Sequence, residues 1–163
     1  MKNIRLLTFL CLLIPNFIYS QNVFDYRGER HSFNKYVINA RQKNKTLHKK
    51  INDTESFEST YLGKIKVVTG GQYYLVSSVF LSDMKKSLKA DYHIFIYNGN
   101  KKYVGYYYLS TSGQHPKLLK NNTLIFESSD CENKILVSFE KGIPRAINLK
   151  CNNQNDFYEF NSK

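Results

Sequence analysis

From Tyr61 onward the sequence consists of short runs of β-branched and aromatic residues, and groups of turn-forming residues separate them. Gly70-Gly71 and Asn98-Gly99-Asn100 each lie between two such runs, as in the tight turn of a β-hairpin. The strands expected from this pattern are 64–69, 72–81, 92–97, 102–109, 118–119, 124–127, 134–139, 145–150 and 157–160. The pattern therefore predicts a mainly β (α+β) fold, an antiparallel meander or open barrel of about eight strands.

A different pattern precedes the strands, and it predicts one amphipathic helix over residues 32–50. Apolar residues there follow the i, i+3, i+4, i+7 spacing of a helix, and Ser32 is suited to the N-cap position. The residues of the apolar stripe are Phe33, Tyr36, Val37, Ala40, Leu47 and Ile51. We expect this stripe to pack on the sheet; a helix lying on a membrane surface is the alternative, since the opposite face is basic. Residues 52–60 are predicted to be a linker, and residues 82–90 a short helical turn.

The first twenty residues have the layout of a cleaved secretory leader. Lys2 and Arg5 precede an apolar run from Leu6 to Ile18, and Ser20 is a small residue suited to the cleavage site. An uncleaved anchor and a buried N-terminal helix are the alternatives, but the apolar run is shorter than the roughly 20 residues that span a bilayer. The prediction is an exported protein, periplasmic or secreted, with no transmembrane segment after leader cleavage. Residues 21–60 and 61–163 would then form one folding unit.

Two cysteines remain after the leader, and an even pair in an exported protein suggests a disulfide. Glu140-Lys141-Gly142 fits a three-residue hairpin loop in which Phe139 faces Ile143. The same register places Cys131 directly opposite Cys151, at a distance that a disulfide accepts. The sequence therefore predicts a Cys131–Cys151 bond across a hairpin of 134–139 and 145–150, with two unpaired buried thiols as the alternative.

Residues suited to catalysis are few and scattered. The histidines, His31, His48, His93 and His115, have no metal-ligand spacing, and the sequence has neither a Gly-rich phosphate loop nor a Gly-x-Ser-x-Gly elbow. Ser112 and His115 share one loop, and Asp91 and His93 share one face of a strand, where they could form an orienter–base pair. Neither pair by itself indicates a reaction, so the sequence predicts no catalytic residues, no metal and no cofactor.

The most unusual local feature is the tyrosine-rich run 103–108. On a regular strand, Val104, Tyr106 and Tyr108 share one face and Tyr103, Gly105 and Tyr107 the other. One face should pack on the core, and the other would expose tyrosines, which are favoured at interfaces. Gly105 leaves a gap that a ligand or a neighbouring ring can approach. Cross-strand aromatic packing is the structural alternative to a binding face formed by Tyr103, Tyr106, Tyr107 and Tyr108.

Composition narrows the choice of partner. Loss of Lys2 and Arg5 with the leader lowers the formal net charge from +11 to +9. The remaining basic residues are spread along the chain, whereas a nucleic-acid binder usually gathers them in a patch. We expect a protein partner or an anionic envelope component, a polysaccharide or a lipid surface, and no nucleic acid.

The sequence favours binding over catalysis, and no motif in it is distinctive enough to indicate a family. The first expectation is an exported binding protein that uses its tyrosine-rich face and nearby lysines. An envelope immunity or inhibitor protein is one alternative, and a hydrolase with dispersed site residues is another.

Overall fold

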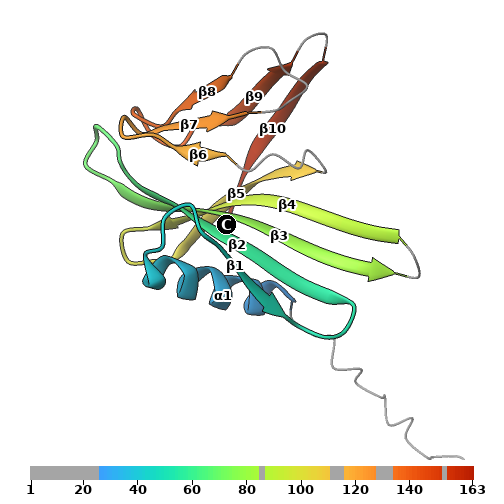
Figure 1. The fold of residues 1–163 in the computed structure, drawn as a ribbon. Coiled ribbons are helices and arrows are strands. Elements are labelled where there is room, and N and C mark those ends of the chain that lie inside the picture. Colours follow the sequence, from blue (N-terminus) through green and yellow to red (C-terminus); the bar gives the residue numbers. More distant parts are fainter. Residues whose placement is uncertain (1–25, 85–86, 111–115, 128–133, 152–153) are drawn as a thin grey trace, which may run out of the picture.

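The computed structural model describes residues 26–84, 87–110, 116–127, 134–151 and 154–163. Within these ranges the chain forms one helix followed by ten strands (Figure 1). They are α1 (Tyr26–Ala40), β1 (Thr46–Lys50), β2 (Glu55–Lys66), β3 (Gln72–Met84), β4 (Ser87–Asn98), β5 (Tyr103–Ser110), β6 (Lys117–Leu118), β7 (Thr123–Phe126), β8 (Ile135–Ser138), β9 (Ala146–Cys151) and β10 (Gln154–Ser162). The predicted mainly β class, with one helix ahead of the strands, is confirmed. The predicted leader lies outside the described residues.

The strands form two sheets. The larger is antiparallel, with seven strands in the order β1-β2-β3-β4-β5-β10-β9, and the smaller has the order β6-β7-β8. Strands β2 to β5 form a meander, as predicted, and β1 extends it by one strand that was not expected. Strand β10 comes from the end of the chain to pair with β5. The large sheet is open, in agreement with the predicted meander or open barrel, and it does not close on itself. Helix α1 covers one of its faces, and the small sheet lies on the other side (Figure 1).

Alternation along the central strands supplies side chains to both sides of the large sheet. On β4, Ile94 and Ile96 belong to the main core between the two sheets, whereas Phe95 and Tyr97 point to the side of α1. Both kinds of position are buried, so β4 is apolar on both faces through its second half. The hairpins 64–69/72–81 and 92–97/102–109 predicted from glycine and asparagine turns are both present.

The predicted helix 32–50 is correct only in its first half. Helix α1 ends at Ala40, and Arg41 and Asn44 both have positive φ angles, of 55° and 61°. Residues 46–50 form β1 and pair antiparallel with β2. Leu47 and Ile51 fit the helical spacing, but they equally fit the inner face of a strand, where they pack beside α1. Pairing with β2 satisfies the backbone hydrogen bonds of this segment, and the helix prediction was wrong there.

Two other local predictions were wrong because long strands tolerate polar residues. Residues 55–60, assigned to a linker, are the beginning of β2. Of the predicted helical turn, residues 82–84 end β3 and residues 87–90 begin β4. Ser82 pairs with Lys89 across these two strands, so strand geometry continues where a helical turn was expected. In the described part of the chain no helix is long and apolar enough to cross a membrane.

The predicted pairing of 134–139 with 145–150 was also wrong. Both segments contain strands, but β8 pairs with β7 and β9 pairs with β10. Gly142 has a positive φ of 137°, yet the loop around it passes from one sheet to the other. The register that placed Cys131 opposite Cys151 is therefore absent. Cys131 lies outside the described residues, and the disulfide stays a prediction without its geometric support.

At Gly105 of β5, the neighbouring strand β10 leaves no room for a side chain. A Cβ atom at this position would lie 2.4 Å from the main-chain oxygen of Asn161 and 2.4 Å from the ring of Phe160. The gap expected beside Gly105 is thus occupied by a neighbouring ring, which packs against the main core. The absence of a side chain here allows β10 to join the sheet.

We therefore expect Gly105→Ala to lower the free energy of unfolding by about 1–3 kcal/mol, as overpacking does in well-packed cores. Gly99→Ala is the control, because the nearest atom to its Cβ would be 3.8 Å away. Urea denaturation of both variants measures the difference. Equal stability of the two variants would show that β10 can shift to accommodate the methyl group.

Candidate functional site

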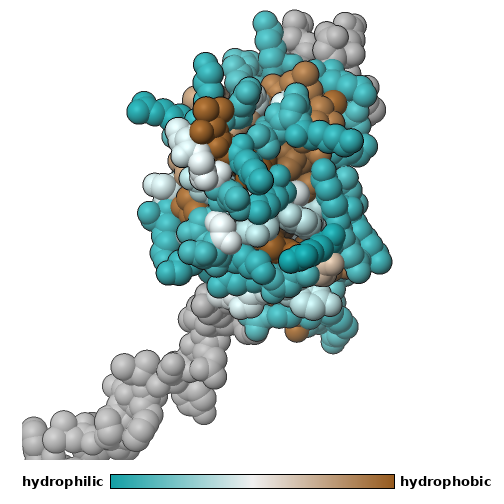
Figure 2. All heavy atoms as spheres, turned by 90° about the vertical axis from the view of Figure 1, so that its left-hand side faces the viewer, coloured by the Kyte–Doolittle hydropathy of each residue, from teal (hydrophilic) through white to brown (hydrophobic). Residues whose placement is uncertain are grey.

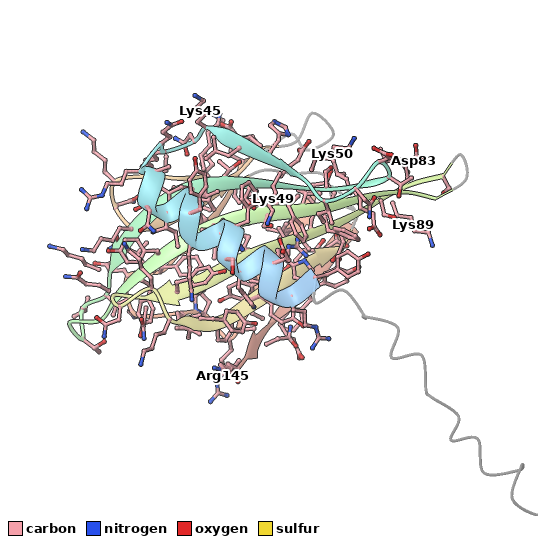
Figure 3. All side chains as sticks on the ribbon, turned by 90° about the horizontal axis from the view of Figure 1, so that it is seen from below. Lys45, Lys49, Lys50, Asp83, Lys89 and Arg145 are labelled. Carbon is pink, nitrogen blue, oxygen red and sulfur yellow. The ribbon has the colours of Figure 1, made fainter. Side chains whose placement is uncertain are left out.

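The buried stripe of α1 is partly polar. The residues that α1 buries against the sheet are Arg30, Phe33, Asn34, Val37 and Ile38. They recur at three- and four-residue intervals, so the stripe has ordinary helical spacing although two of its members carry polar groups. Viewed from below, α1 runs diagonally across the sheet, and Lys49 of β1 reaches Glu29 of α1 to form an ion pair (Figure 3). The polar members of the stripe build the candidate site.

Arg30 is almost completely buried, and its guanidinium is held by β3 and β4. Nε donates to Oγ of Ser78 at 3.0 Å, and Nη2 donates to the main-chain oxygens of Ser78 and Asp91 at 2.7 and 2.9 Å. Nη1 donates to Oδ2 of Asp91 at 3.2 Å, which makes an ion pair. Four hydrogen bonds to two adjacent strands fix both the position and the plane of the guanidinium.

Aromatic rings enclose the same guanidinium. Its central carbon lies 4.9 Å from the ring centroid of Phe95 and 5.9 Å from that of Phe57, within the range of cation–π attraction. Burial lowers the pKa of Arg30 to about 10, and the Asp91 carboxylate acts in the opposite direction. Arg30 therefore remains charged at neutral pH.

A chain of hydrogen bonds continues from this point along the helix–sheet interface. Ser59 donates to Oδ1 of Asn34 at 2.7 Å, and Asn34 donates from Nδ2 to the hydroxyl of Tyr97 at 3.1 Å. The Tyr97 hydroxyl also lies 2.9 Å from Nδ1 of His31. Burial raises the pKa of Tyr97 well above its usual value, so its proton stays available for this network. The network pairs the polar groups that α1 and the sheet would otherwise leave unsatisfied in the interface.

His93 is adjacent to the Arg30–Asp91 pair. Its Nδ1 is 3.6 Å from Oδ2 of Asp91, and this buried nitrogen has no hydrogen-bond partner among the described residues. Its ring stacks on Phe95 with centroids 5.2 Å apart. Burial, and then the charge of Arg30, lower the pKa of His93 to about 4, while Asp91 opposes the shift. His93 is therefore neutral at pH 7.

A cavity of about 370 Å³ opens between the N-terminal half of α1 and the sheet. Arg30 and Asp91 contribute charged groups to its wall, the imidazoles of His31 and His93 line it as well, and Arg27 is exposed. The aromatic residues that line it are Tyr26, Phe57, Phe80, Phe95, Tyr103 and Tyr106. This combination of ring faces with a few fixed polar groups is typical of a small-ligand site.

The structure distributes the predicted tyrosine face differently from regular alternation. Gly105 pairs with Ile96 but Tyr103 pairs with Tyr97, so β5 has one extra residue, Val104, at a β-bulge. The bulge brings Tyr103 onto the α1 side together with Tyr106, where both pack beside Phe95 and Tyr97. Strict alternation therefore gave the wrong face for Tyr103.

The other two predicted tyrosines have separate environments. Tyr108 lies against His93, with ring centroids 5.0 Å apart, and is 46 % exposed. Tyr107 is fully buried in the main core and donates a hydrogen bond to the main-chain oxygen of Pro144. Three of the four predicted tyrosines thus lie on the α1 side, and Tyr107 cannot contact a ligand there.

The predicted pair of Asp91 and His93 is brought together, but its geometry does not match an orienter and a base. The Asp91 carboxylate accepts its hydrogen bond from Arg30, and neither serine, threonine nor cysteine lines the described cavity beside His93. Ser112 and His115 lie outside the described residues. Across the described ranges, no three His, Cys, Asp or Glu side chains gather closely enough to hold a metal ion.

Sequence reasoning missed Arg30, Asn34, Ser78 and Tyr97. Arg30 and Asn34 are one helical turn apart and alternate with Phe33 and Val37, which was the available signal. A search for apolar spacing passes over polar residues in such a stripe. Comparison of the chain with protein-family models, with curated proteins and with solved structures found no match. The geometry of the site is therefore the basis for the functional argument.

Replacement of Arg30 by methionine tests how much α1 depends on the guanidinium. Arg30→Met keeps the length of the side chain but leaves the Asp91 carboxylate without its cation. Loss of one partner of a buried ion pair costs about 3–5 kcal/mol, and the 39 % exposure of Asp91 reduces this to about 2–4 kcal/mol. Chemical denaturation should show this loss. Lys35→Met, on the exposed face of α1, should change stability by less than about 0.5 kcal/mol.

The neutral state of His93 predicts a specific dependence of stability on pH. The pKa of His93 is about 4 in the folded protein against 6.5 for the ordinary side chain, so between these pH values the unfolded chain binds more protons. Stability is therefore complete above pH 6.5 and is lost as the pH falls toward 4.

His93→Phe retains a ring and removes this titration. Between pH 7 and pH 4 the parent should lose about 2–3 kcal/mol more than the variant, at roughly 1.4 kcal/mol for each pH unit. Denaturant melts at both pH values measure the difference, and His48→Gln, at an exposed site, is the control. Parallel losses in the parent and in His93→Phe would contradict the assignment.

Proposed function

We propose that this protein is an exported binding protein without catalytic activity, and that its ligand enters the cavity between α1 and the sheet. The observation that carries the proposal is the convergence of aromatic rings from α1, β2, β3, β4 and β5 on a cavity that also contains two guanidinium groups. Rings offer flat apolar contact area, and the fixed polar groups orient what binds.

The chemistry of the wall favours a ligand that carries a ring and an acidic group. Tyr103 and His31 have ring centroids 4.2 Å apart and form one side, and Tyr106 packs beside Phe95. Arg27 is exposed, with no carboxylate partner among the described residues, so it can receive an anion. An envelope saccharide with an acidic substituent has both features, and it agrees with the expected compartment.

Ser78 lies opposite His93 in the sheet, but its hydroxyl is fully buried and accepts a hydrogen bond from Arg30. Among the described residues no serine, threonine or cysteine lines the cavity beside His93 and Asp91, which supports binding over hydrolysis. A hydrolase would also require Asp91 to orient His93, and its carboxylate is committed to Arg30. An immunity or inhibitor protein would bind a partner enzyme through its outer surface, so substitutions inside the cavity would leave its affinity unchanged. The two readings are therefore separable by mutation.

Tyr106→Leu tests the cavity directly. Mature protein beginning at Gln21 is titrated by calorimetry with acidic and neutral oligosaccharides from the envelope, and envelope proteins are tested in parallel by pull-down. We expect the variant to bind its saccharide about tenfold more weakly, which is about 1.4 kcal/mol and typical of an aromatic contact. Tyr36→Leu is the matched control, because Tyr36 is 61 % exposed on the far side of α1.

Three results would contradict the proposal. The first is that the parent protein binds no saccharide and no other ligand that carries a ring. Another is a partner protein whose affinity is the same for the parent and for Tyr106→Leu, which would favour the inhibitor reading. The last is turnover that disappears in His93→Phe, which would favour the hydrolase.

A further inference from the structure

One end of the molecule gathers basic residues that are far apart in the sequence. Five segments meet there: 41–45 after α1, the β2–β3 turn with its flanks (64–72), the β4–β5 turn (98–102), and the turns 119–122 and 140–142. They contain nine basic residues and a single acidic one, Glu140. The basic residues are Arg41, Lys43, Lys45, Lys64, Lys66, Lys101, Lys102, Lys120 and Lys141.

Hydrogen bonds between the segments hold this basic end together. Nζ of Lys43 donates to the main-chain oxygen of Leu118 at 2.9 Å, and Nδ2 of Asn122 donates to that of Lys66 at 2.8 Å. The amide of Val68 donates to the main-chain oxygen of Glu140 at 3.0 Å. The end lies at the left of Figure 1 and faces the viewer in Figure 2, where hydrophilic side chains cover most of it and a few apolar ones lie between them.

The basic end contains a second cavity, of about 340 Å³, beside the C-terminal end of α1. Arg41, Lys64 and Lys101 surround it, and Tyr61 and Tyr74 supply aromatic rings with centroids 6.4 Å apart. Ile38 completes the lining. Nζ of Lys64 lies 5.8 Å from the ring centroid of Tyr74, so the cation and the ring are presented together.

Among the described residues, the three cations of this cavity have no carboxylate partner. No acidic residue lines it, and none of the ion pairs formed within the described ranges includes Arg41, Lys64 or Lys101. By contrast, Arg30, Lys49, Lys50 and Lys117 each pair with a carboxylate. The carboxylates of Asp53, Glu55 and Asp83 lie toward the opposite end of the sheet, where Figure 3 labels Asp83. Like charges held close together without a counter-ion destabilise the free protein, and an anion would remove that cost.

We infer that this second cavity binds an acidic residue of an anionic polysaccharide. A cavity of this size accepts one sugar ring, the tyrosines offer ring faces, and the three cations can hold a sulfate or carboxylate. Lys43, Lys66, Lys102 and Lys120 continue the positive surface around it, so neighbouring acidic units of the same polymer find further cations. The inference is independent of what the cavity beside Arg30 binds.

The test compares two variants of equal charge. Arg41→Gln/Lys64→Gln/Lys101→Gln removes the cations of the cavity, and Lys50→Gln/Lys89→Gln/Arg145→Gln removes three at sites outside the basic end (Figure 3). Heparin and polygalacturonate are the sulfated and carboxylated probes, and neutral dextran is the uncharged one. We expect the first variant to bind both acidic polymers at least tenfold more weakly, and the second to change affinity less than threefold. The salt dependence of binding should also be reduced in the first variant only.

Tyr74→Leu removes an aromatic ring from the cavity without changing the charge. It therefore distinguishes binding that needs the ring from binding by positive charge alone. It should weaken polymer binding severalfold, whereas Tyr36→Leu, on the exposed face of α1, should leave it unchanged. Circular dichroism melts of each variant check that the fold is retained.

Several outcomes overturn the inference. Equal losses in the two triple variants would mean that only net charge matters. If inorganic sulfate binds the cavity as tightly as one acidic group of the polymer does, the cavity is a simple anion site and not a polysaccharide site. Binding to vesicles containing phosphatidylglycerol, or to single-stranded DNA, more tightly than to either polymer would assign the basic end to a membrane or a nucleic acid.

Discussion

The burial of the Arg30 guanidinium between α1 and the large sheet is the interaction on which the architecture of this side of the molecule depends. A charge in that position is tolerated because Ser78 and Asp91 accept its hydrogen bonds and Asp91 supplies the opposite charge. The same bonds join α1 to β3 and β4 at fixed positions. A helix with a purely apolar stripe could shift along the sheet at little cost in free energy. The hydrogen bonds of Arg30 instead favour one position of α1 on the sheet.

The two cavities lie toward opposite ends of α1. One cavity, next to Arg30 and Asp91, is mainly aromatic, and the other, next to Arg41, is surrounded by cations. Both cavities combine aromatic rings with cations, so both suit a ring that carries an acidic group. Both lie at the helix–sheet boundary, where side chains of the two layers diverge.

Much of the β architecture was predictable because its signals are local. Gly70-Gly71 and Asn98-Gly99-Asn100 turn the chain by their own conformational preferences, so the hairpins they close were found. The errors were made where pairing with another segment decides the conformation. Residues 46–50 become a strand because β2 is available to pair with them, and β8 pairs with β7 although β9 is the next strand along the chain. Tyr103 changes face because of a bulge that alternation does not encode.

The sequence by itself determined the mainly β class, the order of helix and strands, most of the turns and the excess of positive charge. These properties follow from propensities and spacings within a few residues. Only the tertiary structure decided that Arg30, Ser78 and Asp91 meet, that Tyr107 is buried while Tyr106 lines a cavity, and that basic residues from five segments share one end. The basic residues are scattered along the sequence, and they form a patch because the folded chain brings the turns that carry them to the same end of the molecule. The physical reason is that strand pairing and burial are long-range, and their partners are chosen by the whole fold.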